Sequence, residues 1–363
     1  MSQNSLTDWY FDLASGRRKG LTAAMWRAAL AMASVPYGLA VSGRNRLWDA
    51  GWKAAQRASV PVVSIGNLTL GGTGKTPAVE WVARFYRSLD FRVAVLSRGY
   101  GSTGGANDEA LLLEENLPDV PHLQGTDRAA LARIAVEELE SELLILDDGF
   151  QHRRLERDLD VVLIDSTNPW GYGWLFPRGL LREPLCALKR ADLVVLTRCD
   201  LISANRLAQL RKEVEKLAPG KPLVESLHAA QQLVRCVHGK EAEGHGEGMT
   251  QAPLGLLQGR PVAGFCGIGN PDAFRETLER LQGKLVSWRT YPDHHPYSRQ
   301  DVEELREWAA QLPADAIVVT TQKDLVKLRL AELKGRPLWA LRIALQITAG
   351  QDVLDRLLKG VLQ

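Results

Sequence analysis

A glycine-rich loop between an apolar run and an amphipathic run constrains the fold of this chain more than any other feature. The loop, GNLTLGGTGKTP at residues 66–77, follows the apolar residues 60–65 and precedes an amphipathic stretch at 78–89. A strand, such a loop and a helix in this order hold an anion at the N-terminus of the helix, where successive backbone N–H groups point at it. Glycine adopts the positive φ angles of such a loop without steric cost. The sequence therefore predicts a site for the phosphates of a nucleoside triphosphate.

Individual residues of this loop have separate predicted tasks. Lys75 can reach the outer phosphates, and the hydroxyl of Thr76 can ligate Mg²⁺. Thr69 stands where the P-loop pattern has its first glycine, so the pattern is incomplete. The alternative is a glycine-rich turn with a chance lysine, and the flanking strand and helix argue against it. The residues that we expect to bind the nucleotide are Gly71, Gly72, Thr73, Gly74, Lys75 and Thr76.

A pair of aspartates supports the nucleotide site. Asp147 and Asp148 directly follow the apolar run 143–146, which predicts a short buried strand. A P-loop fold holds its Mg²⁺ through an acidic residue at the C-terminal end of such a strand. Adjacent residues of a strand point to opposite faces, so which of the two aspartates ligates the metal stays open. The alternative is a solvated Asp-Asp-Gly turn.

The first 60 residues differ from the rest in composition. They carry eight Lys and Arg residues against three Asp, and they contain four of the ten tryptophans. The apolar segment 28–43 lies between Arg27 and Arg44 and is shorter than the about 20 residues that a membrane span needs. Basic flanks with tryptophans favour a helix that lies in the interface of an anionic membrane. The alternative is an ordinary helix packed on its domain.

The remaining chain alternates between predicted strands and helices, which indicates a parallel sheet with right-handed crossovers. We expect an α/β fold, a P-loop NTPase-like parallel sheet with helices on both faces, plus a second smaller α/β domain and an N-terminal interfacial helix. The predicted strands are 91–96, 143–146, 161–164, 193–196, 261–268, 284–290 and 316–319, and the predicted helices include 126–139, 271–281 and one that begins at Ser298 with a capping-box spacing. The expected domains are an N-terminal segment at 1–55, a P-loop core at 56–225 and the smaller domain at 226–363.

The four cysteines are scattered without a C-x-x-C pair, so they predict neither a zinc site nor a disulfide framework.

Other motifs, taken together, identify the chain more specifically. It resembles the tetraacyldisaccharide 4'-kinase (lipid A 4'-kinase) family over nearly its whole length. The motifs that carry the resemblance are GNLTLGGTGKTP at 66–77, SRGYGS at 97–102, NDEA at 107–110, LDDGFQHRRLERDLDVVLID at 146–165, FPRGLLREP at 176–184, LTRCD at 196–200, FCGIGNPDAF at 265–274, DHHPY at 293–297 and TQKDLVKL at 321–328.

The resemblance implies a definite reaction and location. A member of this family transfers the γ-phosphoryl group of ATP, with Mg²⁺, to the 4'-hydroxyl of a tetraacylated glucosamine disaccharide 1-phosphate. The implied location is peripheral, on the cytoplasmic face of the bacterial inner membrane, with residues 1–55 against its anionic surface. The smaller domain is expected to close over the site. Neither a nucleic acid nor an obligate protein partner is implied.

The resemblance also implies roles for residues outside the phosphate loop. Asp108 matches the catalytic base, and His294 is expected to pair with it, with His295 as the alternative. Because Asp108 belongs to the first expected domain and His294 to the second, this pair is expected to form on domain closure. Arg182 and Glu183 are expected to touch phosphate or Mg²⁺.

Supporting roles and nucleotide-base contacts complete the expected site. Gln151 and His152 are expected to support the carboxylate loop. The segments 197–200 and 321–324 both resemble the base-reading segments of GTPases, and we assign base contact to the second, through Gln322 and Asp324. Two competing classes are a P-loop ATPase or GTPase switch that acts on a partner protein and a non-catalytic membrane adaptor. The switch predicts stable self-association on nucleotide binding, and the adaptor leaves Lys75, Asp148 and Asp108 without a task.

Overall fold

The computed structural model describes residues 3–99, 108–237 and 248–363. Its contacts divide the chain into two compact units. The first unit comprises residues 1–99, 119–228 and 345–363, and the second comprises 100–118 and 229–344. The boundary expected at 225/226 is near the observed division after His228, but two segments lie elsewhere than expected. Residues 100–118 belong to the second unit, and the C-terminal residues 345–363 belong to the first.

The first unit is built on a parallel sheet with the strand order β7-β6-β5-β1-β4-β2-β3. Every neighbouring pair in this order is parallel. The strands are β1 (Val62–Asn67), β2 (Val93–Ser97), β3 (His122–Gln124), β4 (Leu143–Asp147), β5 (Leu159–Asp165), β6 (Leu193–Thr197) and β7 (Leu223–Val237), of which β7 continues into the second unit. This arrangement confirms the predicted fold class, in which crossovers between parallel strands run through helices.

The helices of this sheet are α3 (Lys75–Arg87), α5 (Arg128–Glu137), α6 (Ala204–Leu217) and α10 (Gln351–Gly360). The core on one face joins β-strand residues such as Leu144 and Leu146 to Ala132 of α5. Tyr86 of α3 is fully buried, and its hydroxyl donates a hydrogen bond of 2.8 Å to the carbonyl oxygen of Leu358 in α10. The C-terminal helix is therefore an integral part of the first unit. Short 3₁₀ helices lie at η1 (Gly171–Gly173), η2 (Leu185–Arg190), η3 (Cys199–Leu201) and η5 (Leu254–Leu257).

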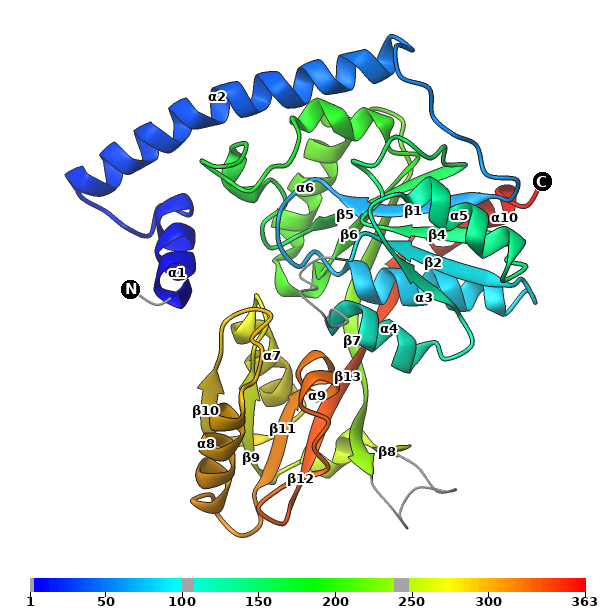
Figure 1. The fold of residues 1–363 in the computed structure, drawn as a ribbon. Helices are drawn as coiled ribbons and strands as arrows, with labels where there is room; N and C mark the ends of the chain where they lie inside the picture. The colour runs from blue at the N-terminus through cyan, green and yellow to red at the C-terminus, as the bar shows by residue number, and fades with distance from the viewer. Residues whose placement is uncertain (1–2, 100–107, 238–247) are drawn as a thin grey trace. The chain divides into compact units, whose positions relative to one another are not determined.

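Two helices precede the sheet, α1 (Gln3–Ala14) and the long α2 (Leu21–Asp49), drawn in blue in Figure 1. One side of α2 is fastened to the first unit. The hydroxyl of Ser34 donates to the carbonyl oxygen of Leu175 at 3.0 Å, and that of Tyr37 to the carbonyl oxygen of Arg182 at 2.9 Å. No helix within residues 3–99, 108–237 and 248–363 combines the length and apolar content needed to cross a bilayer.

The strands of the second unit are ordered β10-β9-β11-β13. The C-terminal part of β7 pairs antiparallel with β8, and β12 pairs antiparallel with β13. The elements are β8 (Gly248–Ala252), β9 (Pro261–Cys266), β10 (Lys284–Thr290), β11 (Ile317–Thr321), β12 (Glu332–Leu333), β13 (Arg336–Ala349), α4 (Asp108–Asn116), α7 (Pro271–Arg280), α8 (Arg299–Ala310) and α9 (Gln322–Leu328). The capping box predicted at Ser298 is present, with Asp301 as its second member. Phe265 lies at the centre of this unit's core with Leu305 and Leu325.

The phosphate loop is held in place by short polar contacts. The side-chain amide of Asn67, at the end of β1, donates to the carbonyl oxygen of Thr69 at 2.8 Å and to the hydroxyl of Thr73 at 2.9 Å. Gly74 caps the N-terminus of α3 in the left-handed region, with φ of 88°. A Cβ atom at Gly74 would lie 2.4 Å from Nε2 of His228, which is far too close. Both its backbone angle and this neighbour therefore require glycine.

We predict that Gly74→Ala destabilises the protein, because the methyl group meets the ring of the partly buried His228 and the left-handed φ is strained. Overpacking of this kind costs about 1–3 kcal/mol, and unfavourable backbone angles add to it. The measurement is thermal unfolding without nucleotide. Gly72→Ala is the matched control, because a Cβ atom there would have no neighbour within 4 Å. Equal melting temperatures for the two variants would contradict the packing argument.

Candidate active site

Three charged side chains from separate elements meet beside the phosphate loop. Lys75, the first residue of α3, has its Nζ 3.7 Å from Oδ1 of Asp148. One guanidinium nitrogen of Arg182 lies 2.7 and 2.8 Å from the two carboxylate oxygens of Asp148. All three side chains are at least four-fifths buried. The structure therefore brings the predicted loop lysine and one predicted carboxylate into one cluster. Arg182 connects this cluster to α2, because its carbonyl oxygen accepts the hydroxyl of Tyr37.

Asp148 is held by its backbone as well as by its side chain. Strand β4 ends at Asp147, and Asp148 adopts the left-handed region with φ of 54°. Arg128, at the start of α5, donates to the carbonyl oxygen of Asp148 at 3.0 Å. Burial alone would raise the pKa of Asp148, but Lys75 and Arg182 outweigh it and lower that pKa. The carboxylate is therefore ionised near neutral pH. The two aspartates differ in backbone conformation, because β4 includes Asp147 but ends before Asp148.

Gln151 and His152 lie in the turn that follows the two aspartates. Gln151 accepts a hydrogen bond from Arg182 at 3.3 Å and donates to the carbonyl oxygen of Asn67 at 2.9 Å. It thus connects the carboxylate turn to the strand that leads into the phosphate loop. His152 is part of the same turn, and burial together with Arg128 lowers its pKa to about 4. A neutral imidazole at this position adds no further positive charge to the cluster.

Oxygen donors suitable for Mg²⁺ occur on two elements of the first unit. Thr76 is buried in the first turn of α3, and Asp147 is buried at the end of β4. Among the described residues no three His, Cys, Asp or Glu side chains gather as a metal-binding group. Mg²⁺ usually takes one or two carboxylates and fills its other positions with phosphate and water oxygens. A hydroxyl with one or two aspartates is therefore a donor set that fits this ion.

Glu183 has a different environment from the one expected for a metal ligand. It is fully buried, and its two carboxylate oxygens receive Arg44 at 3.0 Å and Asn45 at 2.8 Å, both from α2. Arg190 forms an ion pair with it at 2.9 Å. The carboxylate is thus satisfied by protein groups, and it fastens α2 to the first unit. We therefore do not retain Glu183 among the candidate magnesium ligands.

Asp108 and His294 meet inside the second unit. Nδ1 of His294 lies 2.9 Å from both carboxylate oxygens of Asp108. Asp108 is buried at the start of α4, whereas the His294 side chain is 53% exposed. His295 instead lies against Asp301 and stacks on Tyr291. The expectation that the pair forms only on domain closure is wrong, because both partners belong to one compact unit.

The charges around this pair separate the pKa values of its members. Burial would raise the pKa of Asp108, but the hydrogen bond from His294 and the cations Lys323 and Lys327 lower it to about 2. The hydrogen bond to Asp108 raises the pKa of His294. A strongly ionised carboxylate that orients a half-exposed imidazole is an arrangement suited to general base catalysis by the imidazole. His294 also has an unusual backbone, with φ of 58°, of the kind that clusters at functional sites.

The residues expected to read the nucleotide base are engaged with protein groups. Asp324 is fully buried, and its carboxylate accepts hydrogen bonds from the backbone N–H of Gly267, the hydroxyl of Thr321 and the hydroxyl of Tyr297. The amide of Gln322 donates to Asn116 of α4 at 2.8 Å. These contacts fix α9 within the second unit, so we do not carry the base-reading assignment of Gln322 and Asp324 forward.

The first candidate base-reading segment, by contrast, contacts the phosphate loop. The hydroxyl of Thr197 donates to the carbonyl oxygen of Thr73 at 2.9 Å.

Sequence reasoning missed two residues of the first unit, Arg128 and His228, because neither belongs to a local pattern that indicates its partner. It also missed Lys327, although its spacing of three residues from Asp324 places both on one side of a helix.

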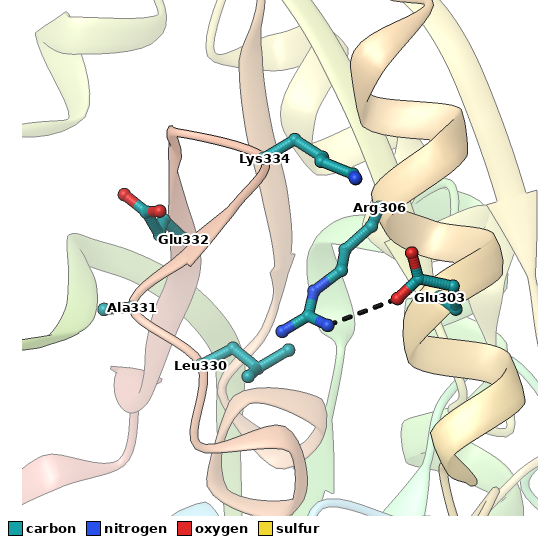
Figure 2. Close-up of a pocket in the computed structure, with 6 residues that line it drawn as sticks. All are labelled: Glu303, Arg306, Leu330, Ala331, Glu332 and Lys334. Atoms are coloured by element: carbon teal, nitrogen blue, oxygen red, sulfur yellow. Dashed lines mark hydrogen bonds and ion pairs between the residues drawn. The ribbon is translucent and has the colours of Figure 1, made fainter.

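A separate hollow of about 360 Å³ lies on the second unit between α8 and the turn around β12 (Figure 2). Helix α8 forms one wall of this hollow, and within it Arg306 donates to Glu303 at 3.2 Å. Its remaining lining residues are Leu330, Ala331, Glu332 and Lys334. None of them is a predicted site residue, and the hollow is not part of the candidate active site.

Comparison with known proteins assigns the family. The family model for tetraacyldisaccharide-1-P 4'-kinases matches residues 26–363. Tetraacyldisaccharide 4'-kinase of Anaeromyxobacter dehalogenans (strain 2CP-C) is 42% identical over 358 residues, covering 93% of this chain and 91% of the relative. The protein of that name from Syntrophus aciditrophicus (strain SB) is 37% identical over 338 residues, covering 86% and 87%.

A solved structure agrees with these sequence matches. The crystal structure of LpxK from Aquifex aeolicus in complex with ATP superposes with a TM-score of 0.71 at 30% identity, covering 93% of this chain and all of that one. The agreement extends over both units, well beyond the phosphate loop. On the family model, the relatives and this structure together, the chain belongs to the tetraacyldisaccharide 4'-kinase family.

Proposed function

We propose that this enzyme transfers the γ-phosphoryl group of ATP to the 4'-hydroxyl of a tetraacylated glucosamine disaccharide 1-phosphate. The observation that carries the proposal is the pairing of Lys75 with the Asp148 carboxylate at the N-terminus of α3, in a chain of this family. Phosphoryl transfer depends on positioning and charge neutralisation more than on covalent chemistry. A loop of backbone amides with a lysine and nearby carboxylates supplies both.

The first unit provides the phosphate-binding groups of the proposed reaction. Lys75 and the backbone N–H groups of residues 71–76 bind the β- and γ-phosphates. Thr76, with Asp147 or Asp148, would hold Mg²⁺, which supplies positive charge to the phosphate oxygens when bound. Arg182 keeps the Asp148 carboxylate in a fixed orientation beside Lys75.

The second unit provides the acid–base groups of the proposed reaction. Nε2 of the half-exposed His294 accepts the proton of the sugar hydroxyl as that hydroxyl attacks the γ-phosphorus and ADP leaves. Asp108 holds Nδ1–H of the ring and stabilises the imidazolium that forms. A nucleotide-driven switch that acts on a partner protein is not favoured, because it gives this buried aspartate and its histidine no reaction to perform.

The acceptor is a lipid, so we also propose that α2 docks on the cytoplasmic surface of the inner membrane. Along α2 five large apolar side chains are exposed by 61% to 79% of their surface: Leu21, Met25, Met32, Val35 and Leu39. Exposed apolar area of this kind marks an interaction surface. The exposed cluster Arg17, Arg18 and Lys19 lies next to it, in the turn before α2. An apolar helix face flanked by basic residues fits the interface of an anionic membrane.

The central test is transfer of labelled phosphate from ATP to the disaccharide lipid, followed by thin-layer chromatography. We predict that Lys75→Ala lowers turnover at least ~10²-fold, because the loss of an electrostatic clamp on a transferring group has an effect of that order. Thermal unfolding should be little changed. Lys189→Ala removes a charge from an exposed position of η2 and serves as the control. Activity of Lys75→Ala within a few-fold of wild type would exclude this lysine from the mechanism.

A double-mutant cycle tests the acid–base pair. We predict that Asp108→Asn and His294→Ala each lower kcat by roughly 10²–10⁴-fold, the general range for a positioned base. The double variant should be hardly worse than either single one, because residues that act as one unit give non-additive losses. ATP affinity, measured by calorimetry, should change little. Multiplicative losses would disprove the pair, and a severe defect in His295→Ala with a normal His294→Ala would transfer the role to His295.

Vesicle sedimentation tests the membrane surface. Replacing Arg17, Arg18 and Lys19 with glutamate should weaken binding to anionic vesicles by about 10²-fold or more, because each basic residue near such a surface contributes about 1 kcal/mol. ATP binding should persist. The control replaces three other exposed basic residues of the first unit with glutamate: Arg133, Lys212 and Lys216. Equal vesicle binding by the two triple variants would mean that α2 packs as an ordinary helix.

A further inference from the structure

Lys327 occupies an unusual position behind the acid–base pair. It lies in the last turn of α9, and its side chain is 14% exposed. Its Nζ is 3.7 Å from Oδ2 of Asp108 and 3.4 Å from Oδ1 of Asp324. It also lies over the ring of Tyr297, 5.4 Å from the centroid. One largely buried ammonium group thus connects two buried carboxylates, and one of them is the partner of His294.

At the far end of this connection, several hydrogen bonds hold Asp324. The fully buried Asp324 accepts the backbone N–H of Gly267 at 3.2 and 3.1 Å and the hydroxyl of Thr321 at 2.6 Å. The hydroxyl of Tyr297 donates to Oδ1 of Asp324 at 3.0 Å. Gly267 in turn accepts a hydrogen bond from the backbone N–H of His294 at 3.2 Å. The anchor of Lys327 and the backbone of His294 therefore belong to the same hydrogen-bond network.

We propose that Lys327 is a positioning residue for phosphoryl transfer, which holds the Asp108 carboxylate so that both its oxygens remain on Nδ1 of His294. The proposal rests on the proposed acid–base role of that pair. A carboxylate shared between an ammonium group and an imidazole is fixed from two sides. The positive charge of Lys327 also offsets part of the attraction between the Asp108 carboxylate and the imidazolium form of His294. Lys327 therefore limits how far Asp108 raises the pKa of His294.

The direction of the expected effect follows from the charges that face the pair. Asp108 faces His294, Lys323 and Lys327, and His294 faces Asp108, Asp293 and Lys323. Lys323 is itself paired with Glu109 at 3.1 Å. Removing the Lys327 charge leaves the Asp108 carboxylate to act on His294 alone, which stabilises the imidazolium and raises its pKa. Removing the Asp108 charge has the opposite effect and lowers the pKa of His294.

The test is the pH profile of kcat together with the NMR titration of His294. Because the base must be neutral to accept a proton, the acidic limb of the profile follows the pKa of His294 in the complex. Lys327→Met should move this limb upward by about half a pH unit or more, as expected for losing a unit charge a few ångströms from the pair. It should also lower kcat about tenfold through loss of orientation. Asp108→Asn should move the limb downward. Lys327→Arg, which keeps the charge, should leave it in place.

Lys334→Met is the matched control, because Lys334 lies in the exposed turn after β12 and lines the hollow in Figure 2. The acidic limb of the kcat profile and the NMR titration of His294 in this variant should equal those of the wild type. A folded Lys327→Met with an unmoved limb and titration would overturn the proposal and leave Lys327 a structural residue. If Lys327→Met does not fold, a folded Lys327→Arg with a displaced limb has the same consequence. Near-normal turnover in Asp108→Asn would instead reject the acid–base pair itself, so the two failures are distinguishable.

Discussion

The ion pair between Arg182 and Asp148 is the contact on which the first unit's site depends. Asp148 leaves the ladder of β4 in a left-handed conformation, so its carboxylate needs a partner that fixes its direction. Arg182 supplies that partner, and Lys75 approaches the same carboxylate from the phosphate loop. A buried carboxylate is tolerated only when cations and hydrogen bonds compensate its desolvation. The cluster is therefore stable as a group: Arg182 still compensates Asp148 when Lys75 is lost, whereas loss of both cations would leave a buried charge uncompensated.

The same segment of chain connects this cluster to the N-terminal helix. Arg182 binds Asp148 through its side chain, and its carbonyl oxygen accepts the hydroxyl of Tyr37. The next residue, Glu183, holds Arg44 and Asn45 of the same helix. The backbone of Arg182 also contacts the start of the phosphate loop, because its N–H donates to the carbonyl oxygen of Leu68. The proposed membrane-facing helix and the nucleotide loop are thus joined through two consecutive residues.

Local patterns predicted the elements and the phosphate loop well, because strand, glycine-rich loop and helix follow one another in sequence. The fold class and the family are confirmed, whereas the catalytic roles stay predictions. What local patterns could not supply was partner choice between distant residues. Nothing near Glu183 indicates that Arg44 will satisfy it, and nothing near Asp324 indicates that Gly267 and Tyr297 will. The expectation that residues 100–118 belong to the P-loop core failed for the same reason, since their place in the second unit depends on the packing of α4 against α9.

The order in which the chain is synthesised has a consequence for the first unit. Its sheet and phosphate loop are complete by about residue 228, yet it also contains residues 345–363, and the buried hydroxyl of Tyr86 donates to Leu358 in the last helix. During synthesis on the ribosome, the side of α3 that carries Tyr86 therefore lacks its contact with α10 until the second unit and α10 have been translated. A nascent chain that stops before Leu358 lacks the acceptor of the Tyr86 hydroxyl, so a polar group made for the core has no partner there.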